Sequence, residues 1–475
     1  MKNILAKINP EIKKNYWLEV STSRILIVVV LISLVAGIVI LSTDTKTSFR
    51  LARNMQILGM SGYVFFILLW GLRNASNAIS EELNNRTWDF QRMTPVRPST
   101  LAIGKLFGST VFNWFGGGIC ILIYLIASFF SEQVFIDLQY GVMMLFVGLF
   151  GHSIVIALSL IGIEKFRNQR KARTGLYYLI GLLASLYLGY KAFEITLAKV
   201  DYVNWFNITF TQNTFAIITI LFFALWAVFA LYRNMRKELQ FINGPWGWLA
   251  FVFSIMLFVA GFASETKEIN FSSYWIVGIY LAFFAAIITT YIMALLEPKE
   301  MVMFRQLIAL FKQKKFKQFF NKLPAWLLSL TVVLLFIPLL IVASIILNNT
   351  IIPGSWQRYV GEQIGIHSII FPITILFFIV RDLAIMSIVN ITFKKGRKDF
   401  TVMVLLFILY GVLPFFVNSI TNDALPHMFL PIPDETMLSI ILVTPQVIIA
   451  LILLVVVWKN NRSKYDKINE SITSA

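Results

Sequence analysis

The sequence has little charge, one cysteine and few histidines, and each scarcity excludes a class of protein. Charged residues make up 14% of the 475-residue chain, against about 25% in soluble domains, which excludes a soluble globular protein of this length. A single cysteine, Cys120, excludes an intrachain disulfide. The three histidines, His152, His367 and His427, stand far apart without a second ligand at metal spacing, so we expect packed or interfacial residues and no metal site.

Motifs for nucleotide binding and catalysis are absent from the sequence as well. There is no Gly-x-x-x-x-Gly-Lys-Ser/Thr loop, so the chain cannot bind ATP in the manner of P-loop proteins. His-Glu-x-x-His, Cys-x-x-Cys and Gly-x-Ser-x-Gly are missing too, and no catalytic or cofactor-binding residue is predicted. If ATP drives this protein, ATP and Mg²⁺ are expected on a separate chain.

Long apolar runs are what the sequence has in abundance. Hydrophobic residues make up 58% of the chain, and its mean hydropathy is +0.76. A run of about 20 apolar residues crosses a hydrocarbon core about 30 Å thick. The runs predict an all-α, polytopic helical membrane protein with about twelve transmembrane helices, at residues 24–42, 55–72, 107–130, 139–163, 176–193, 214–232, 246–263, 274–296, 325–347, 367–391, 400–418 and 436–458.

The distribution of basic residues predicts the orientation. With both termini cytoplasmic, the outer segments hold few of the 41 lysines and arginines: Lys46, Arg50, Arg53, Lys191, Lys199, Lys267 and Arg358. Such a bias is the usual sign of the cytoplasmic face in a cell-membrane protein. Attraction to anionic lipid explains the formal charge of +17, and a nucleic-acid partner is not expected.

A polar segment, residues 73–106, follows the second expected span. No glycine or proline interrupts residues 75–93, so we expect one helix there, and Pro95 and Pro98 then end it. At the turn we expect exposed aromatic and apolar anchors ringed by charge, which is typical of a protein-docking surface, in residues Arg86, Trp88, Asp89, Phe90, Arg92, Met93 and Arg97. The alternative is that Trp88 rests in the lipid headgroup zone.

This segment resembles the loop between the second and third spans in permease subunits of ABC-2-type ATP-binding-cassette transporters. The matching residues are Glu81, Glu82, Thr87, Trp88, Phe90, Pro95, Ser99, Gly104 and Lys105. The resemblance covers about residues 1–230. The sequence departs from the family at Arg86, where glycine is usual. The chain also has about twice the six spans that are usual in the family. It implies a coupling loop that docks on an ATPase subunit through Arg86, Thr87, Trp88, Asp89, Phe90, Arg92, Met93 and Pro95.

Two further segments are patterned as amphipathic interfacial helices. The first begins at Pro10, with Glu11 at its start and aromatic residues among charges at Tyr16 and Trp17. The second is residues 297–324, which hold seven basic residues and apolar residues at helical spacing. A frayed basic tail and a solvated linker are the respective alternatives.

We expect two transmembrane bundles, residues 1–240 and residues 241–475. The sequence of the second bundle is compatible with a degenerate repeat of the first bundle, in which Arg381 aligns with Arg73. A second coupling region is then expected around residues Arg381, Asp382, Lys394, Lys395 and Arg397. We expect Arg381 and Asp382 to lie at the membrane interface.

These observations predict the permease subunit of an ABC-2-like exporter. Its expected partners are a separate ATPase dimer, anionic lipid, and a second permease chain, identical or different. The alternatives are a secondary transporter with twelve spans, which would need buried ionisable residues for ion coupling, and a membrane-embedded enzyme or assembly factor.

Overall fold

The computed structural model describes residues 9–43, 48–94, 96–166, 174–197, 202–265, 271–297, 299, 301–348, 366–393, 398–420, 428–431 and 436–473. The chain divides into two compact units. Unit 1 comprises residues 1–203 and 209–243, and unit 2 comprises residues 204–208 and 244–475. Each unit has its own hydrophobic core.

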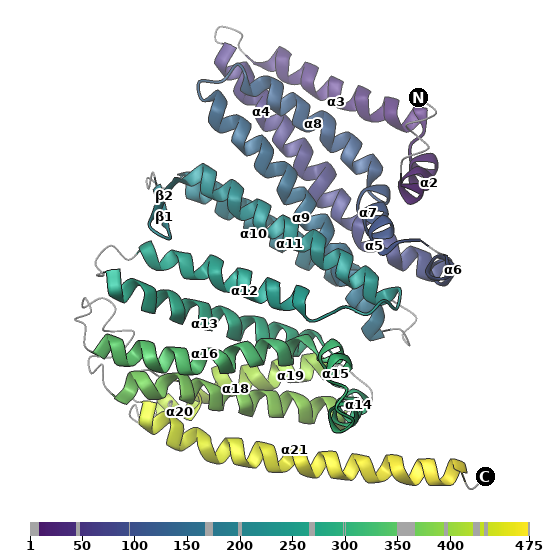
Figure 1. Ribbon diagram of the computed structural model, residues 1–475. Coiled ribbons are helices and arrows are strands. Elements are labelled where there is room, and N and C mark those ends of the chain that lie inside the picture. The colour runs from purple at the N-terminus through teal and green to yellow at the C-terminus, as the bar shows by residue number, and fades with distance from the viewer. Residues whose placement is uncertain are drawn as a thin grey trace. The chain divides into compact units, whose positions relative to one another are not determined.

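Unit 1 is helical (Figure 1). Helix α9 packs against α5, α10 and α11, α4 packs against α8, and α2 packs against α7. The π-helix η1 continues α4 into α5. The elements are α2 (Pro10–Glu19), α3 (Thr22–Ser42), α4 (Ser48–Tyr63), η1 (Val64–Gly71), α5 (Leu72–Asn84), α6 (Trp88–Met93), α7 (Pro98–Gly108), α8 (Val111–Ser128), α9 (Val134–Phe166), α10 (Thr174–Leu197) and α11 (Gln212–Glu238).

Unit 2 is also helical, with α13 against α12 and α16, and α18 against α16 and α21. It contains a 3₁₀-helix, η2, and a second π-helix, η3. The elements are α12 (Trp246–Ala260), η2 (Gly261–Glu265), α13 (Phe271–Leu296), α14 (Met301–Lys312), α15 (Phe316–Lys322), α16 (Ala325–Asn348), α18 (Ile366–Thr392), α19 (Lys398–Phe407), η3 (Ile408–Val412), α20 (Leu413–Ile420) and α21 (Thr436–Thr473).

The helices are those of a multi-pass membrane protein. Among the described residues, eleven helices are long and apolar enough to span a bilayer. Helix α10 has a shorter apolar stretch, Thr174–Tyr190, where the sequence predicts a span at 176–193. The all-α membrane fold is therefore confirmed, and the count of twelve stays a prediction.

Among the described residues, one β-hairpin is the only regular element that is not helical, and the prediction of an all-α fold did not include it. It pairs β1 (Tyr202–Trp205) with β2 (Ile208–Thr211). The two residues between the strands, Phe206 and Asn207, have φ of 49° and 61°. Two positive φ values in a two-residue loop are the mark of a type I′ turn, which matches the twist of paired strands.

The π-helix η1 is held open by side chains from neighbouring helices. The amide of Asn113 donates to the carbonyl of Phe66 at 3.2 Å, and His152 Nε2 lies 3.0 Å from the carbonyl of Ile67. Both contacts place a side-chain nitrogen against a backbone carbonyl of the π-helix. The expectation that His152 is a packed residue is confirmed. His367 and His427 give no described side chain.

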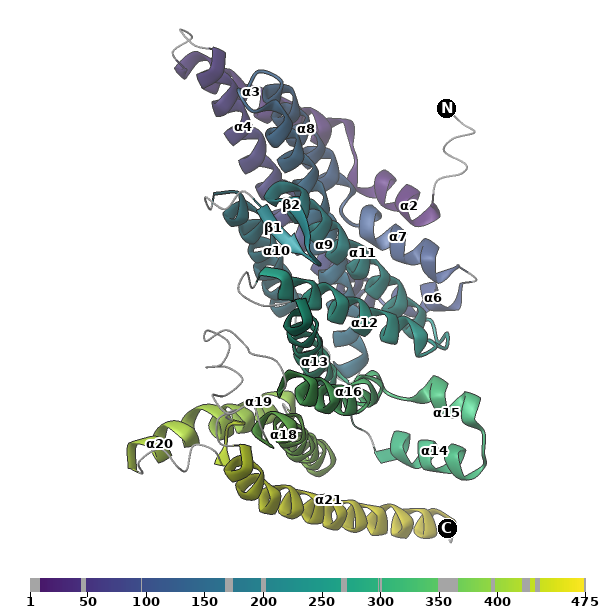
Figure 2. The same cartoon turned by 60° about the vertical axis from the view of Figure 1, so that its left-hand side comes forward.

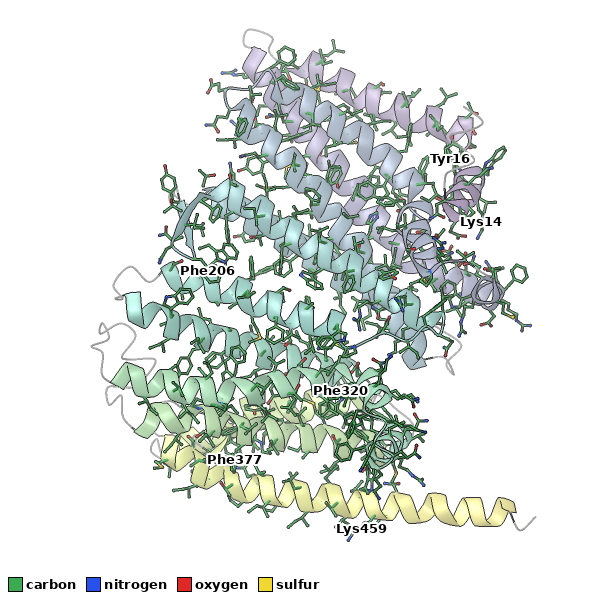
Figure 3. The ribbon with its side chains drawn as sticks, in the orientation of Figure 1. Lys14, Tyr16, Phe206, Phe320, Phe377 and Lys459 are labelled. Carbon is green, nitrogen blue, oxygen red and sulfur yellow. The ribbon has the colours of Figure 1, made fainter. Side chains whose placement is uncertain are left out.

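The basic segment at residues 297–324 forms two helices rather than one. Helix α14 ends where Lys314 adopts a φ of 57°, and α15 then begins at Phe316. The amides of Lys314 and Lys315 bond back to Phe311 and Leu310, which is the hydrogen-bonding pattern of a helix C-terminus closed by a left-handed residue. Figure 3 labels Phe320 on α15, one of the exposed aromatic residues of this segment.

Candidate coupling site and a buried ion pair in the membrane

The polar segment between α5 and α7 has a sharp turn that the sequence does not predict. Arg86 has a φ of 56°. Its amide donates to Leu83 and that of Thr87 donates to Glu82, so the C-terminal carbonyls of α5 are satisfied. The single helix expected over residues 75–93 is therefore wrong: α5 ends at Asn84 and α6 begins anew at Trp88. Arg86 occupies a position where glycine is the least strained residue.

The turn directs Trp88 into the protein. Its side chain is 1% exposed, and its indole Nε1 donates to Glu238 Oε1 at 3.3 Å. Arg92 contacts the same residue, with Nε 3.4 Å from Glu238 Oε1 and 3.2 Å from the Glu238 carbonyl oxygen. The expectation that Trp88 is presented at the turn is wrong, because α6 packs on the last turn of α11. The alternative, in which Trp88 contacts the lipid headgroups, also disagrees with a side chain that is 1% exposed.

The opposite face of α6 is exposed and apolar. Phe90 is 71% exposed and Met93 is 80% exposed. Asp89 and Arg92 form an exposed ion pair at 3.4 Å beside them. A recess of about 370 Å³ lies next to Met93, lined by Asp89, Arg92, Met93, Leu239 and Gln240. Two of the three expected anchors are therefore accessible to a partner.

A buried lysine ties α7 to α2 and α5. Lys105 Nζ lies 2.7 Å from Glu11 Oε1 and 2.5 Å from Glu82 Oε2, and its side chain is 2% exposed. Lys14 reaches the same two carboxylates at 3.3 and 3.2 Å. Gln91 of α6 donates to Glu82 Oε1 at 2.7 Å. We call Glu11, Lys14, Glu82 and Lys105 the four-charge cluster. A buried charge is tolerated only with such partners, so the cluster fixes the relative positions of three helices.

The backbones of α2 and α7 approach each other closely beside the four-charge cluster. A Cβ atom at Gly104 would lie 2.5 Å from Cβ of Glu11, and one at Gly108 would lie 2.8 Å from Nδ2 of Asn15. Two glycines four residues apart on α7 thus allow α2 to lie against it. Both views place α2, α6 and α7 at the same end of unit 1 (Figure 1, Figure 2), and Figure 3 labels Lys14 and Tyr16 on α2.

The charges on α2 perturb one another. Burial raises the pKa of Glu11, but Lys105 and Lys14 outweigh it, so the pKa is lowered below the ordinary value of 4.5. Lys14 shows the matching effect: its pKa is raised by Glu11 and Glu82 against the effect of burial. Glu19 behaves differently, because burial and the neighbouring Glu81 raise its pKa to about 7 against the opposing effect of Arg24.

The remaining residues of the expected coupling loop are exposed or lie outside the described chain. Arg86, Thr87 and Asp89 are exposed, and Thr87 Oγ1 donates to the Glu82 carbonyl. Pro95 lies outside the described residues. Glu238 belongs to the site as well, although no sequence pattern pointed to it, because it lies 150 residues from Trp88 along the chain.

In unit 2, Arg381 and Asp382 lie at the middle of a span. The apolar part of α18 runs over Ile370–Thr392, and the two residues are 1% and 0% exposed. The interfacial position expected for them is therefore wrong, and neither side chain is accessible to a docking partner. Lys394, Lys395 and Arg397 lie outside the described residues. Arg73 is exposed, so its alignment with buried Arg381 gives the proposed repeat no structural support.

A polar network surrounds this buried pair. Arg381 Nε lies 3.0 Å from Asp382 Oδ1, and Arg381 Nη1 donates to Gln446 of α21 at 2.9 Å. Asp382 Oδ2 accepts from the hydroxyls of Tyr291 on α13 and Tyr410 in η3. Arg381 Nη2 is buried without a hydrogen-bond partner in the described chain. The network joins three helices of unit 2 to its π-turn, at a depth where charges are costly and often functional.

The fold is that of a multi-pass helical membrane protein. One unit carries a polar segment with an exposed apolar helix face at Phe90 and Met93, and the other carries a buried ion pair within a span. Comparisons with protein-family models, with characterised proteins and with solved structures find no match to this chain.

Proposed function

We propose that this chain is the membrane-spanning permease subunit of an ABC-2-like exporter in the cytoplasmic membrane. It has twelve spans and both termini in the cytosol, and a separate ATPase dimer supplies ATP and Mg²⁺ chemistry. The ATPase docks on the coupling loop, residues 73–106. The basic residues support this orientation, since the outer segments hold seven of 41 lysines and arginines.

The construction of α6 is the observation that carries the proposal. A docking element needs an exposed apolar tip on a rigid support. Phe90 and Met93 provide the tip, and the recess beside Met93 adds concave surface. Trp88 and Arg92 provide the support, because both attach α6 to Glu238. Trp88 thus acts on docking through its effect on the position of α6, and Phe90 and Met93 are the contact residues.

The four-charge cluster links the helices that the proposed motion would displace together. Glu82 lies near the end of α5 beside α6, and Lys105 links it to α7 and to Glu11 of α2. A displacement of α6 by the ATPase is passed to the ends of α5, α7 and α11 as one connected body. Rigid-body shifts of packed helices are a common form of transport-related change.

Co-purification tests the docking. Membranes that contain the full chain are solubilised gently, and bound P-loop proteins are identified and quantified by mass spectrometry. The double variant Phe90→Ala, Met93→Ala is expected to bind the ATPase at least about thirtyfold more weakly than the wild type and to retain correspondingly less of it, since loss of one hot-spot residue costs roughly 2 kcal/mol or more. Phe135→Ala, which truncates an equally exposed phenylalanine on α9, is the matched control. Undiminished ATPase in the double variant would overturn the proposal.

The Arg381–Asp382 network favours a second candidate, secondary transport without an ATPase. Ion-coupled carriers need ionisable groups near the middle of the membrane, and this pair has that location. The two candidates differ in their energy source. Uptake or efflux in vesicles that follows an imposed ion gradient and ceases in Asp382→Asn would favour the second, and strict dependence on ATP and the partner ATPase would favour the first.

A further inference from the structure

A large cavity lies within unit 1, separate from the exposed face of α6. Its volume is about 1180 Å³, above the roughly 300–1,000 Å³ of pockets for small molecules. It lies between α3 on one side and α4, η1, α5 and α8 on the other, and α2 borders one end. Helix α3 leaves this space because it packs loosely: its buried side chains are Val28 and Ile32.

The greater part of the cavity is apolar and has the depth of one lipid leaflet. Its lining includes Ile27, Leu31, Val35, Phe65, Phe112 and Ile123. From Arg24 to Val35 the α3 wall extends about 16 Å at the rise of an α-helix, close to half of the roughly 30 Å hydrocarbon core. Leu31, which lines the cavity, is also 57% exposed. The space is therefore continuous with the lipid-facing side of α3.

One end of the cavity is polar and carries both signs of charge. The charged residues that line the cavity are Lys14, Glu19, Arg24, Glu81, Glu82 and Lys105. Lys14, Glu82 and Lys105 are already paired within the four-charge cluster. In the described part of the chain no ion pair joins Glu19 or Glu81 to a basic side chain. Arg24 uses one guanidinium N–H, Nη1 to the Glu19 carbonyl at 3.1 Å.

The polar end thus presents two carboxylates that form no ion pair within the described chain, near a guanidinium with unused donors. A carboxylate pair attracts an ammonium group, and a guanidinium is suited to a phosphate. Burial raises the pKa of Glu19 to about 7, and the charge of Glu81 adds to this effect against the opposing charge of Arg24. An added cation between the two carboxylates would relieve their repulsion. An amphiphile that bears a phosphate and a primary ammonium next to an apolar tail matches the whole cavity, whereas a choline headgroup has no N–H to donate to the carboxylates.

We propose that this cavity binds one phospholipid with an amine-bearing headgroup. Its ammonium lies between Glu19 and Glu81, its phosphate faces Arg24, and an acyl chain follows the apolar wall of α3. The lipid arrives sideways from the bilayer, because the cavity meets the lipid-facing side of α3. The proposal does not depend on the proposed transport function, since binding is measured on the chain alone.

Photolabelling of the full chain in vesicles tests the binding. The vesicles contain phosphatidylcholine with a trace of photoactivatable phosphatidylethanolamine or, in a parallel sample, phosphatidylglycerol with the same labelled chain. Labelled peptides are located by mass spectrometry. We expect labels on α3, η1 and α8, with phosphatidylethanolamine incorporated about fivefold more than phosphatidylglycerol, and displaced by unlabelled phosphatidylethanolamine. Equal incorporation of the two lipids into these peptides, or labels spread evenly over all spans, would overturn the proposal.

Two sets of variants separate the headgroup from the tail. Glu19→Gln with Glu81→Gln removes the carboxylates and is expected to abolish the preference for phosphatidylethanolamine. Glu132→Gln, which neutralises an exposed acid elsewhere in unit 1, is expected to keep it. An unchanged preference in the double variant would refute the headgroup assignment.

Leu31→Trp fills the apolar part and is expected to lower labelling by either lipid about fivefold. Leu34→Trp adds the same bulk on α3 at an exposed position that does not line the cavity, and it is expected to label as the wild type does. Equal labelling of the Leu31 and Leu34 variants would refute the tail assignment. The comparison of the two labelled lipids in the wild-type chain, with displacement by unlabelled phosphatidylethanolamine, decides the outcome even if a variant fails to fold.

Discussion

Replacement of Lys105 by methionine is expected to release α2 from the rest of unit 1. The ammonium lies 2.7 and 2.5 Å from two carboxylates, and the lysine side chain is 2% exposed. Removal of one partner from a buried ion pair costs about 3–5 kcal/mol, because the remaining charge stays buried and unpaired. Lys14 still faces both carboxylates, so we take the lower figure of about 3 kcal/mol, which corresponds to about 150-fold more frequent opening of the α2 contact.

Hydrogen exchange measured by mass spectrometry reports this opening. In Lys105→Met, amides of α2 are expected to exchange about two orders of magnitude faster than in the wild type, while those of α9 change little. Lys13→Met is the matched control, since Lys13 is an exposed lysine of α2 outside the four-charge cluster. Addition of Glu82→Gln to Lys105→Met is expected to restore part of the protection. Wild-type exchange in the single variant would refute the role assigned to the cluster.

The same region carries three further predictions. Arg86→Gly is expected to raise thermal stability in detergent by roughly 0.5–1 kcal/mol, because glycine adopts the observed φ of 56° without strain; a lower unfolding temperature would contradict this. Gly104→Val is expected to displace α2 and expose it to proteolysis, since its Cβ would lie 2.5 Å from that of Glu11, and Gly118→Val, with open space around it, is the control. The pKa of Glu19 is raised from 4.5 to about 7, so its protonated form favours the folded state. The free energy of unfolding is therefore expected to fall as the pH rises from 4.5 to above 7, and to fall less in Glu19→Gln. Identical pH profiles of the wild type and the variant would contradict this prediction.

Local properties of the sequence predict the membrane fold and the place of the polar segment at residues 73–106. Apolar runs of fixed length predict spans wherever they occur, and the structure describes eleven such helices. The proline-bounded polar segment after the second span likewise predicts a helix break, and Pro98 does begin α7. Such features need no knowledge of distant residues.

The direction of individual side chains depends on distant residues and was harder to predict. Trp88 is buried in the hydrophobic core of unit 1, where Glu238 accepts its indole N–H, and nothing near Trp88 in the sequence indicates these partners. The turn at Arg86 matters as much, since a left-handed arginine gives no sequence signal of the kind that glycine gives. Arg381 and Asp382 show the same limit: their mid-span position is stabilised by tyrosines and a glutamine from other helices.

The double attachment of α6 to Glu238 has a consequence for distance measurements. Trp88 and Arg92 lie about one turn apart on α6, and both bond to the final residue of α11, so α6 cannot pivot about that residue without loss of a buried contact. The separation between labels on α6 and on the last turns of α11 is thus expected to remain constant through a working cycle. The distance between α6 and α11 can therefore serve as a constant reference when distances to α2 or α3 are measured.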